Sequence, residues 1–167
     1  MAHEEYHGKS PAELADRVWE LAKKLQFALY TTFDGKRMSQ WPLTANAERD
    51  EHAFTFLVGQ DDEKYGHLGQ YPAVVLGFAD ASSNKYVVVN GTAEISNDRA
   101  KIKELWSPFA KAWWDSENDP DIRVLTVRPE HAELWDSPNK LVASAIMLTA
   151  AVTGTKPAVG NHGDVRL

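Results

Sequence analysis

The amino-acid sequence predicts an α+β fold built on an antiparallel β-barrel with flanking helices. About six or seven short strand patterns are separated by turn residues, helices are expected at the beginning, middle and end, and the strands do not alternate with helices as in a doubly wound sheet. The 167 residues match one ordinary domain. We therefore expect a single domain over residues 1–167, with loose or extended tails at 1–10 and 155–167.

A helix is expected from residue 11 to about residue 26. Ser10 is a hydroxyl N-cap, Pro11 suits the first helical position, and Glu13 completes a capping box. Four apolar residues then recur at spacings of four, three and four, which is typical of one face of an amphipathic helix. They are Leu14, Val18, Leu21 and Leu25. This face is expected to pack on the sheet.

The strand patterns begin directly after this helix. They cover residues 27–33, 37–45, 53–58, 73–80 and 85–95. Asp34 and Gly35 predict a hairpin turn between the first two. Asn90 and Gly91 would usually predict another turn, but the segments on either side of them are short. We therefore expect a β-bulge within one strand. The acidic residues 48–51 and 117–121 are interpreted as solvated loops.

The second half of the chain predicts further helices and strands. Asn97 and Asp98 can cap a helix whose apolar residues Ile102, Leu105 and Trp106 share one face. The remaining elements are a helical turn at 113–114, strands over 122–127 and 132–135 with a turn at 129–131, and a helix over 140–152 that Gly154 ends.

Composition and motifs exclude several functional classes. The net charge is −6 and the basic residues are dispersed, which argues against nucleic-acid binding. The chain has no cysteine and its six histidines lack metal-binding spacings, so no disulfide or dedicated metal site is expected. No nucleophile elbow, dinucleotide fingerprint or P-loop occurs, and no residue is assigned as catalytic. The polar N-terminus and the lack of a long apolar run favour a cytoplasmic protein without a membrane span.

Several segments, taken in order, carry a family resemblance. They are WPLT after the predicted hairpin turn, FTFLV followed by DDEK, KYVVVNGTAEI, and the run from DRAKIKELW to AELWDSP. Over residues 26–167 the chain resembles the general stress protein branch of the pyridoxamine 5'-phosphate oxidase-like, FMN-binding split-barrel family. The resemblance implies a split β-barrel and a homodimer with FMN in a cleft between the protomers.

The resemblance also implies which residues contact the cofactor. The strand beside the flavin corresponds to residues 40–44, the next strand to 56–58 and the phosphate-binding turn to 62–64. The cofactor-binding candidates are Gln40, Trp41, Pro42, Leu43, Thr44, Phe56, Leu57, Val58, Asp62, Lys64, Tyr86, Lys111 and Trp113.

Three of these positions depart from the family pattern. The family usually has arginine at the position of Trp41, threonine at that of Val58 and serine at that of Asp62. Tryptophan cannot form the bidentate phosphate contact of arginine, valine donates nothing, and an ionised aspartate only accepts hydrogen bonds. Lys64 is then the donor left in the expected phosphate cluster. Trp41 itself is interpreted as a core or interface residue, and Lys64 equally well as a solvated lysine.

Three hypotheses about the cleft follow from these departures. It binds FMN through Lys64 and backbone amides, or it binds another ligand such as a different flavin, a deazaflavin or a haem-like molecule, or it binds no cofactor and the protein is a non-catalytic, stress-associated dimer. With FMN bound, the protein would be a flavin-dependent oxidoreductase. A true pyridoxamine phosphate oxidase is not expected, because its basic substrate-binding residues are not recognisable here.

Overall fold

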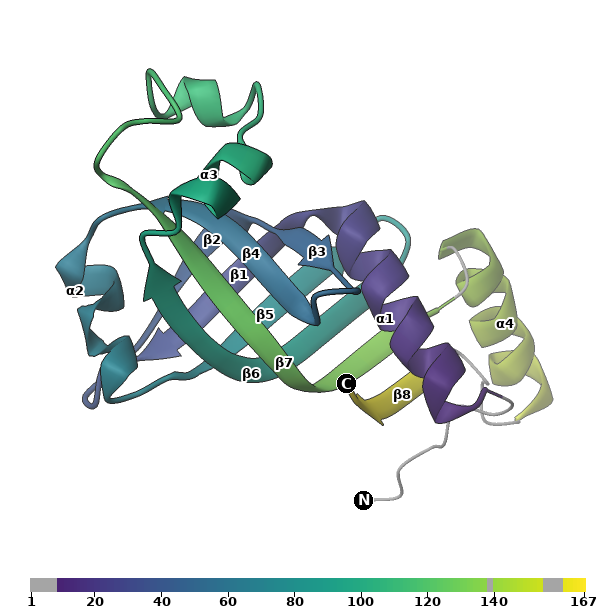
Figure 1. The fold of residues 1–167 in the computed structure, drawn as a ribbon. Helices are drawn as coiled ribbons and strands as arrows, with labels where there is room; N and C mark the ends of the chain where they lie inside the picture. Colours follow the sequence, from purple (N-terminus) through teal and green to yellow (C-terminus); the bar gives the residue numbers. More distant parts are fainter. Residues whose placement is uncertain (1–8, 138–139, 155–160) are drawn as a thin grey trace.

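The computed structural model describes residues 9–137, 140–154 and 161–167. Figure 1 shows a strongly curled antiparallel sheet with helices gathered at its ends. The eight strands run in the order β2-β1-β5-β6-β7-β4-β3, and β8 pairs with β7 outside this path. All strand pairs are antiparallel, which confirms the predicted α+β barrel.

The first helix, α1 (Pro11–Leu25), begins as predicted. The backbone amide of Glu13 donates to the Ser10 hydroxyl at 3.3 Å, and the Glu13 carboxylate accepts from the Ser10 amide at 2.7 Å. Its buried residues are Leu14, Val18, Trp19, Leu21 and Ala22. They cover one end of the barrel core, where the Trp19 ring stacks on that of Phe54 at 4.6 Å between centroids.

A hairpin joins β1 (Phe27–Phe33) to β2 (Met38–Thr44). The carboxylate of Asp34 accepts hydrogen bonds from the amides of Lys36 and Arg37 at 2.8 and 2.9 Å, and Gly35 has a φ of 94°. Only glycine adopts that backbone conformation at little cost, so the predicted turn is confirmed with its physical reason.

The strand β3 (Asn46–Glu48) was not predicted, because its acidic end resembles a solvated loop. It is three residues long and pairs only with the beginning of β4 (Ala53–Gly59). Such a short strand has too few alternating positions to give a sequence pattern. The turn between them places residues 49–52 close to α1.

The strand β5 (Ala73–Asp80) pairs along its whole length with residues 85–92 of β6 (Lys85–Ser96). The register between β6 and β7 shifts at Asn90 and Gly91, which confirms the predicted bulge. A Cβ atom on Gly91 would lie 2.2 Å from the carbonyl oxygen of Arg128, so the two strands approach each other too closely for any side chain there.

The prediction of two separate strands after residue 121 is wrong. β7 (Ile122–Asp136) is one continuous strand that pairs with β4, β6 and β8. Pro129 predicted a turn because proline has no backbone N–H for a ladder. It lies opposite Gly91 at the register shift, where the ladder is already interrupted, so the strand tolerates it.

The C-terminal part contains α4 (Lys140–Thr153) and β8 (Asn161–Arg166). Gly154, with a φ of 67°, follows α4 as predicted. Residues 161–166 are not loose, because they pair with residues 131–136 of β7. The predictions for residues 1–8 and 155–160 lie outside the described residues.

The shorter helices lie in the connections between strands. They are α2 (Asp62–Tyr65) and the 3-10 turn η1 (Gly66–Gly69) after β4, then α3 (Arg99–Leu105) and the 3-10 turn η2 (Ala110–Ala112) between β6 and β7. The side chain of Asp98 caps α3 as predicted. In the part of the chain described, no helix has the length and apolar run that a membrane span needs.

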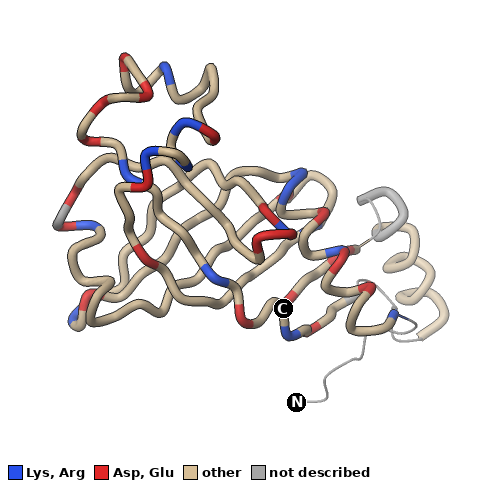
Figure 2. The backbone as a smooth tube through the Cα atoms, in the orientation of Figure 1, with Lys and Arg blue, Asp and Glu red and all other residues tan. Residues whose placement is uncertain are grey.

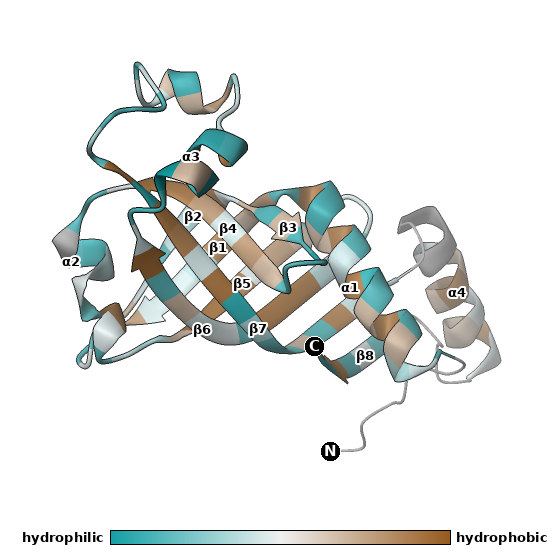
Figure 3. Ribbon diagram, in the orientation of Figure 1, coloured by the Kyte–Doolittle hydropathy of each residue, from teal (hydrophilic) through white to brown (hydrophobic). Residues whose placement is uncertain are grey.

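Figure 3 shows the apolar residues concentrated along the strands. Inward-facing residues of β1, β4, β5, β6 and β7 form the main core with the buried face of α1, and a smaller cluster under α3 contains Ile102, Ile122 and Val124. A partly buried ion pair ties α1 to this core: the guanidinium of Arg17 lies 2.6 Å from the carboxylate of Asp136, which also binds the ammonium of Lys85.

Candidate ligand-binding site

The segment after β4 carries the candidate site. In Figure 1, α2 and η1 lie at the end of the barrel opposite α4. A cleft of about 230 Å³ opens there, lined by Gly59, Gln60, Asp61, Tyr65, Gly66, Ile95 and Arg123. Pockets for small ligands usually measure roughly 300–1,000 Å³. The cleft of this chain is therefore small and open for a molecule of cofactor size.

Lys64 and Trp41 lie together beside this cleft. The ammonium of Lys64 is 5.9 Å from the centre of the Trp41 ring, a cation–π distance. The same ammonium is 3.3 Å from the carboxylate of Asp61. The amide and the ammonium of Lys64, acting against desolvation, hold the pKa of Asp61 below its usual range. The positive charge of Lys64 is thus already matched by a negative one.

A row of aromatic side chains links the cleft to Trp41. Tyr65 lines the cleft, its ring lies 6.3 Å from that of Tyr30, and the Tyr30 ring stacks on Trp41 at 6.4 Å. Burial raises the pKa of both tyrosines to about 12. The Tyr30 hydroxyl is buried without a hydrogen-bond partner among the described residues. Deeper in the same end, the Thr32 hydroxyl lies 2.6 Å from Nε2 of His67.

The predicted residues of β2 divide between the two sides of the sheet. Trp41 and Leu43 are half-buried and pack against the main core. Gln40, Pro42 and Thr44 are exposed on the outer face, because successive side chains of a strand point to opposite sides. Gln40 and Thr31, its partner in register on β1, are joined by a side-chain hydrogen bond of 2.8 Å.

The predicted residues of β4 lie mainly inside the protein. Phe56 is fully buried and Val58 is 4% exposed, so neither presents a surface to a ligand. Leu57 points the other way and packs against the small cluster that contains Ile102. Asp62 begins α2.

The other three predicted residues lie on separate segments. Tyr86 is at the opposite end of β6 from Ile95, which lines the cleft. Lys111 lies in η2 and Trp113 directly after it, on the excursion above α3 in Figure 1, where the Trp113 side chain is 81% exposed. The structure does not bring these residues to Lys64 within the chain.

Sequence reasoning missed Asp61, Gln60 and Arg123 as residues of this region. Arg123 lies opposite Val58 in the pairing of β7 with β4. Its guanidinium donates to the side-chain oxygen of Gln60 and, at 2.6 Å, to the carbonyl oxygen of Pro120. The spacing of three between Asp61, directly before the short helix α2, and Lys64 within it was a usable signal. The sequence contains no such signal for Arg123, because its position beside the cleft comes from the pairing of β7 with β4, two strands that are far apart in the chain.

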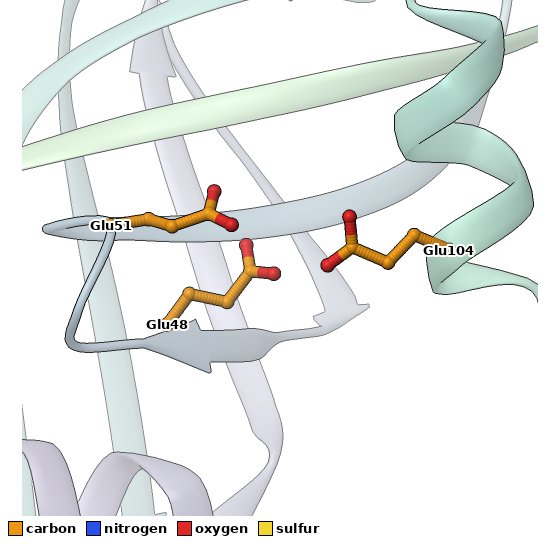
Figure 4. Close-up of side chains that lie close together, drawn as sticks. All are labelled: Glu48, Glu51 and Glu104. Carbon is orange, nitrogen blue, oxygen red and sulfur yellow. The ribbon is translucent and has the colours of Figure 1, made fainter.

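A second cluster of charges lies away from the cleft. Figure 4 shows the carboxylates of Glu48, Glu51 and Glu104 pointing toward one another. The ammonium of Lys101 sits among them at 2.7, 2.9 and 3.1 Å, which holds its pKa above the usual range despite its desolvation. The lysine occupies the position that a metal ion would take, so this cluster is an internal ion-pair network.

The outer face of β2, β1, β5 and residues 85–90 of β6 has no charged residue, and the first charge further along this face of β6 is the exposed Glu94. The pairing of the four strands brings these side chains side by side. They are Phe27, Leu29, Thr31, Phe33, Met38, Gln40, Pro42, Thr44, Ala73, Val75, Gly77, Ala79, Tyr86, Val88 and Asn90. We call this set the uncharged sheet face. Phe27 and Met38 on it are 69% and 61% exposed. Figure 2 shows charged residues on the helices and connections and along other strands.

The residues at the α2 end fit the ring of a flavin better than its phosphate. Tyr65 and Trp41 offer aromatic surface for a flat ring. A phosphate dianion needs free cationic donors, but the ammonium of Lys64 is paired with Asp61, and Arg123 donates to protein oxygens. The phosphate of FMN therefore does not fit the contacts present here.

The curled antiparallel sheet with its flanking helices has the split-barrel fold. The chain belongs to the family described as "Pyridoxamine 5'-phosphate oxidase like", whose model matches residues 13–158. This confirms the family predicted from the sequence.

Individual relatives agree with the family. General stress protein 26 of Bacillus subtilis is 34% identical over 68 residues, which cover 41% of this chain and 46% of that protein, so less than half of that relative is matched. Protein bli-3 of Neurospora crassa is 24% identical over 148 residues, 81% of this chain and 71% of that protein.

Solved structures share the fold. A crystal structure from Jannaschia sp. CCS1 assigned to general stress protein 26 has a TM-score of 0.75 at 21% identity and covers 95% of this chain and 100% of its own. The structure of the general stress FMN/FAD binding protein of Xanthomonas citri has a TM-score of 0.67 at 24% identity and covers 77% and 91%.

Proposed function

We propose that this protein is a homodimeric, flavin-binding protein of the general stress type, in which a second copy packs on the uncharged sheet face and encloses the site beside Trp41. The observation that carries the proposal is the uncharged sheet face itself. A quarter of all residues in the chain are charged, yet this part of the outer surface of four paired strands has none, and the charged Glu94 lies beyond it on β6. Large apolar patches of this kind mark interaction surfaces on soluble proteins.

A second copy is the occupant that the site geometry favours. Pro42 lies on the uncharged sheet face while its neighbour Trp41 faces the aromatic row. Because β2 is the first strand in the sheet order, a copy that packs on this face and extends around β2 would reach the candidate site. The open cleft of one protomer would gain a wall from the partner, and an isologous dimer lets each copy complete the site of the other.

The flavin part of the proposal rests on the family and on the aromatic row. The family is related to a flavin enzyme, and one solved relative is named an FMN/FAD binding protein. When bound, a flavin supplies the electron or hydride transfer. The protein would contribute aromatic contacts from Tyr65 and Trp41 and exclude water through the second protomer.

The dimer is tested by light scattering on the purified chain. We expect a dimer mass for the wild type and a monomer for Leu29→Glu, because a buried unpaired carboxylate opposes association. Lys36→Glu, in the exposed turn of the same hairpin, is the matched control and should stay dimeric. A monomeric wild type at micromolar concentration contradicts the proposal.

A flavin-dependent oxidoreductase is the second candidate, and the family match to an oxidase-like model favours it. Reduced and oxidised flavin spectra of the loaded protein, recorded after addition of nicotinamide donors, test this activity. A loaded protein whose flavin accepts no electrons from any donor would leave the binding function alone.

A further inference from the structure

We infer that the α2 end of this protein provides no binding site for the phosphate dianion of FMN, so that a flavin is taken without preference for its phosphate. This inference rests on the proposed flavin binding and specifies the class of ligand: a flavin ring whose phosphate, if present, stays in solvent.

Lys64 is the cation that the family pattern places at the phosphate. Its ammonium lies 3.3 Å from the Asp61 carboxylate and over the Trp41 ring at 5.9 Å. A phosphate would have to displace the carboxylate or share the lysine with it. Because two anions compete for one cation, the gain from such a contact is small.

The segment directly before Lys64 is negatively charged. Asp61, Asp62 and Glu63 follow one another immediately before Lys64. Three acidic residues in sequence repel a dianion, and the four-residue helix α2 is too short to offset them with its dipole. The segment therefore favours a neutral or positively charged group over a phosphate.

Arg123 is a second cation beside the cleft, but it already donates to protein oxygens. Arg123 uses its guanidinium on the Gln60 side chain and on the carbonyl oxygens of Pro120 and Ile122. These contacts hold it along the backbone of its own strand. Val58, its partner in register, has no donor and is buried.

The Trp41 ring also disfavours a phosphate, because of the space that it fills. Its ring is stacked on Tyr30 and packed against the main core, so it fills space that a phosphate-binding side chain would have to leave open. The indole offers aromatic surface and a single N–H donor. This composition suits the ring of a flavin and gives its phosphate nothing.

The test compares riboflavin with FMN, which differ only by the phosphate. Each is titrated into the purified full-length chain, and binding is followed by quenching of flavin fluorescence. We expect the two dissociation constants to agree within about threefold, because each charge-assisted hydrogen bond to a phosphate would contribute about tenfold or more. FMN binding at least tenfold more tightly than riboflavin, with the difference abolished in Lys64→Ala, overturns the inference.

A variant that restores the family pattern provides the converse measurement. Trp41→Arg combined with Val58→Thr and Asp62→Ser should gain a preference for FMN of about tenfold or more. Trp41→Phe, which keeps an aromatic ring and adds no cation, is the control and should show none. A folded triple variant without FMN preference overturns the inference. If the triple variant does not fold, Asp61→Asn replaces it, since this change frees Lys64 and should by itself favour FMN.

The outcomes separate this inference from the proposed function. If the wild type binds neither flavin while the restored variant binds FMN, flavin binding by this protein fails and the inference about the phosphate stands. If the wild type binds FMN strongly and riboflavin weakly, the proposed function stands and the inference fails.

Discussion

The ammonium of Lys64 lies over the ring of Trp41 and beside the carboxylate of Asp61, at 5.9 Å from the ring centre and 3.3 Å from the carboxylate. The three side chains come from the second strand and from the turn after the fourth. Their charges and the aromatic ring already satisfy one another.

Trp41 and Lys64 should contribute very differently to the stability of the protein. Trp41 packs against the core, and Trp41→Ala should lower the free energy of unfolding by about 2–3 kcal/mol. The Lys64–Asp61 pair is exposed, so Lys64→Ala should cost less than about 0.5 kcal/mol. Urea unfolding of both variants measures the difference. A larger loss for Lys64→Ala would show that the lysine, not the tryptophan, organises this end.

Asp136 should carry a pH-dependent part of the stability. Burial raises the pKa of this carboxyl, but the hydrogen bonds from Arg17 and Lys85 outweigh burial and hold the pKa below its usual range. The stabilisation is therefore complete above the ordinary aspartate pKa of about 4 and is lost as the pH falls through the lower folded-state value. Asp136→Asn should cost about 2 kcal/mol at neutral pH.

Unfolding curves of the wild type and Asp136→Asn between neutral pH and the acid limit check this dependence, because the gap between them should narrow only below about pH 4. Glu20→Gln is the matched control. Glu20 also pairs with Arg17, at 2.8 Å, but it is exposed, and its loss should cost less than about 0.5 kcal/mol. A gap that persists unchanged at low pH would contradict the assignment.

Gly91 should not tolerate any side chain. The Cβ of Gly91→Ala would lie 2.2 Å from the Arg128 carbonyl oxygen and 3.0 Å from Cα of Pro129, and both are backbone atoms that cannot move without separating β6 from β7. We expect a loss of at least about 2 kcal/mol in thermal or denaturant unfolding. Gly69→Ala, where the new Cβ meets nothing within 4 Å, should be nearly neutral. Equal effects of the two changes would refute this account of the bulge.

Tyr30→Phe should leave the protein as stable as before or stabilise it by about 1 kcal/mol. The change removes a buried hydroxyl that has no partner among the described residues, and such a group costs about 1–3 kcal/mol of desolvation. Thr32→Val is the contrasting variant, because its hydroxyl is bonded to His67 at 2.6 Å, and its loss should destabilise. A destabilised Tyr30→Phe would instead reveal a bound water or ligand group at the hydroxyl.

The sequence predicted best what neighbouring residues determine. The capping box of Ser10 and Glu13, the turn at Gly35 and the bulge at Gly91 all depend on local backbone chemistry, and the structure contains each of them. The continuity of β7 was missed, because Pro129 is acceptable only opposite a bulge on another strand.

The candidate site could be predicted only in part, because some of its residues are brought together by strand pairing and not by local sequence. Trp41 and Lys64 were named from the family pattern, and the structure brings them together. Arg123 reaches the cleft through the pairing of β7 with β4, and Asp61 matters because its carboxylate meets the ammonium of Lys64. No local pattern reveals a pairing between strands that are more than sixty residues apart, as Val58 and Arg123 are.

The single long strand β7 has a consequence for how the molecule opens. It pairs with β4, β6 and β8, so both halves of the barrel are hydrogen-bonded to one strand. Neither half can detach without breaking that strand's ladder. Amide hydrogens in the middle of β7 should therefore exchange with solvent only on global unfolding, whereas those of α2 exchange through small local openings. The α2 end can then open locally while the strands of the barrel stay paired.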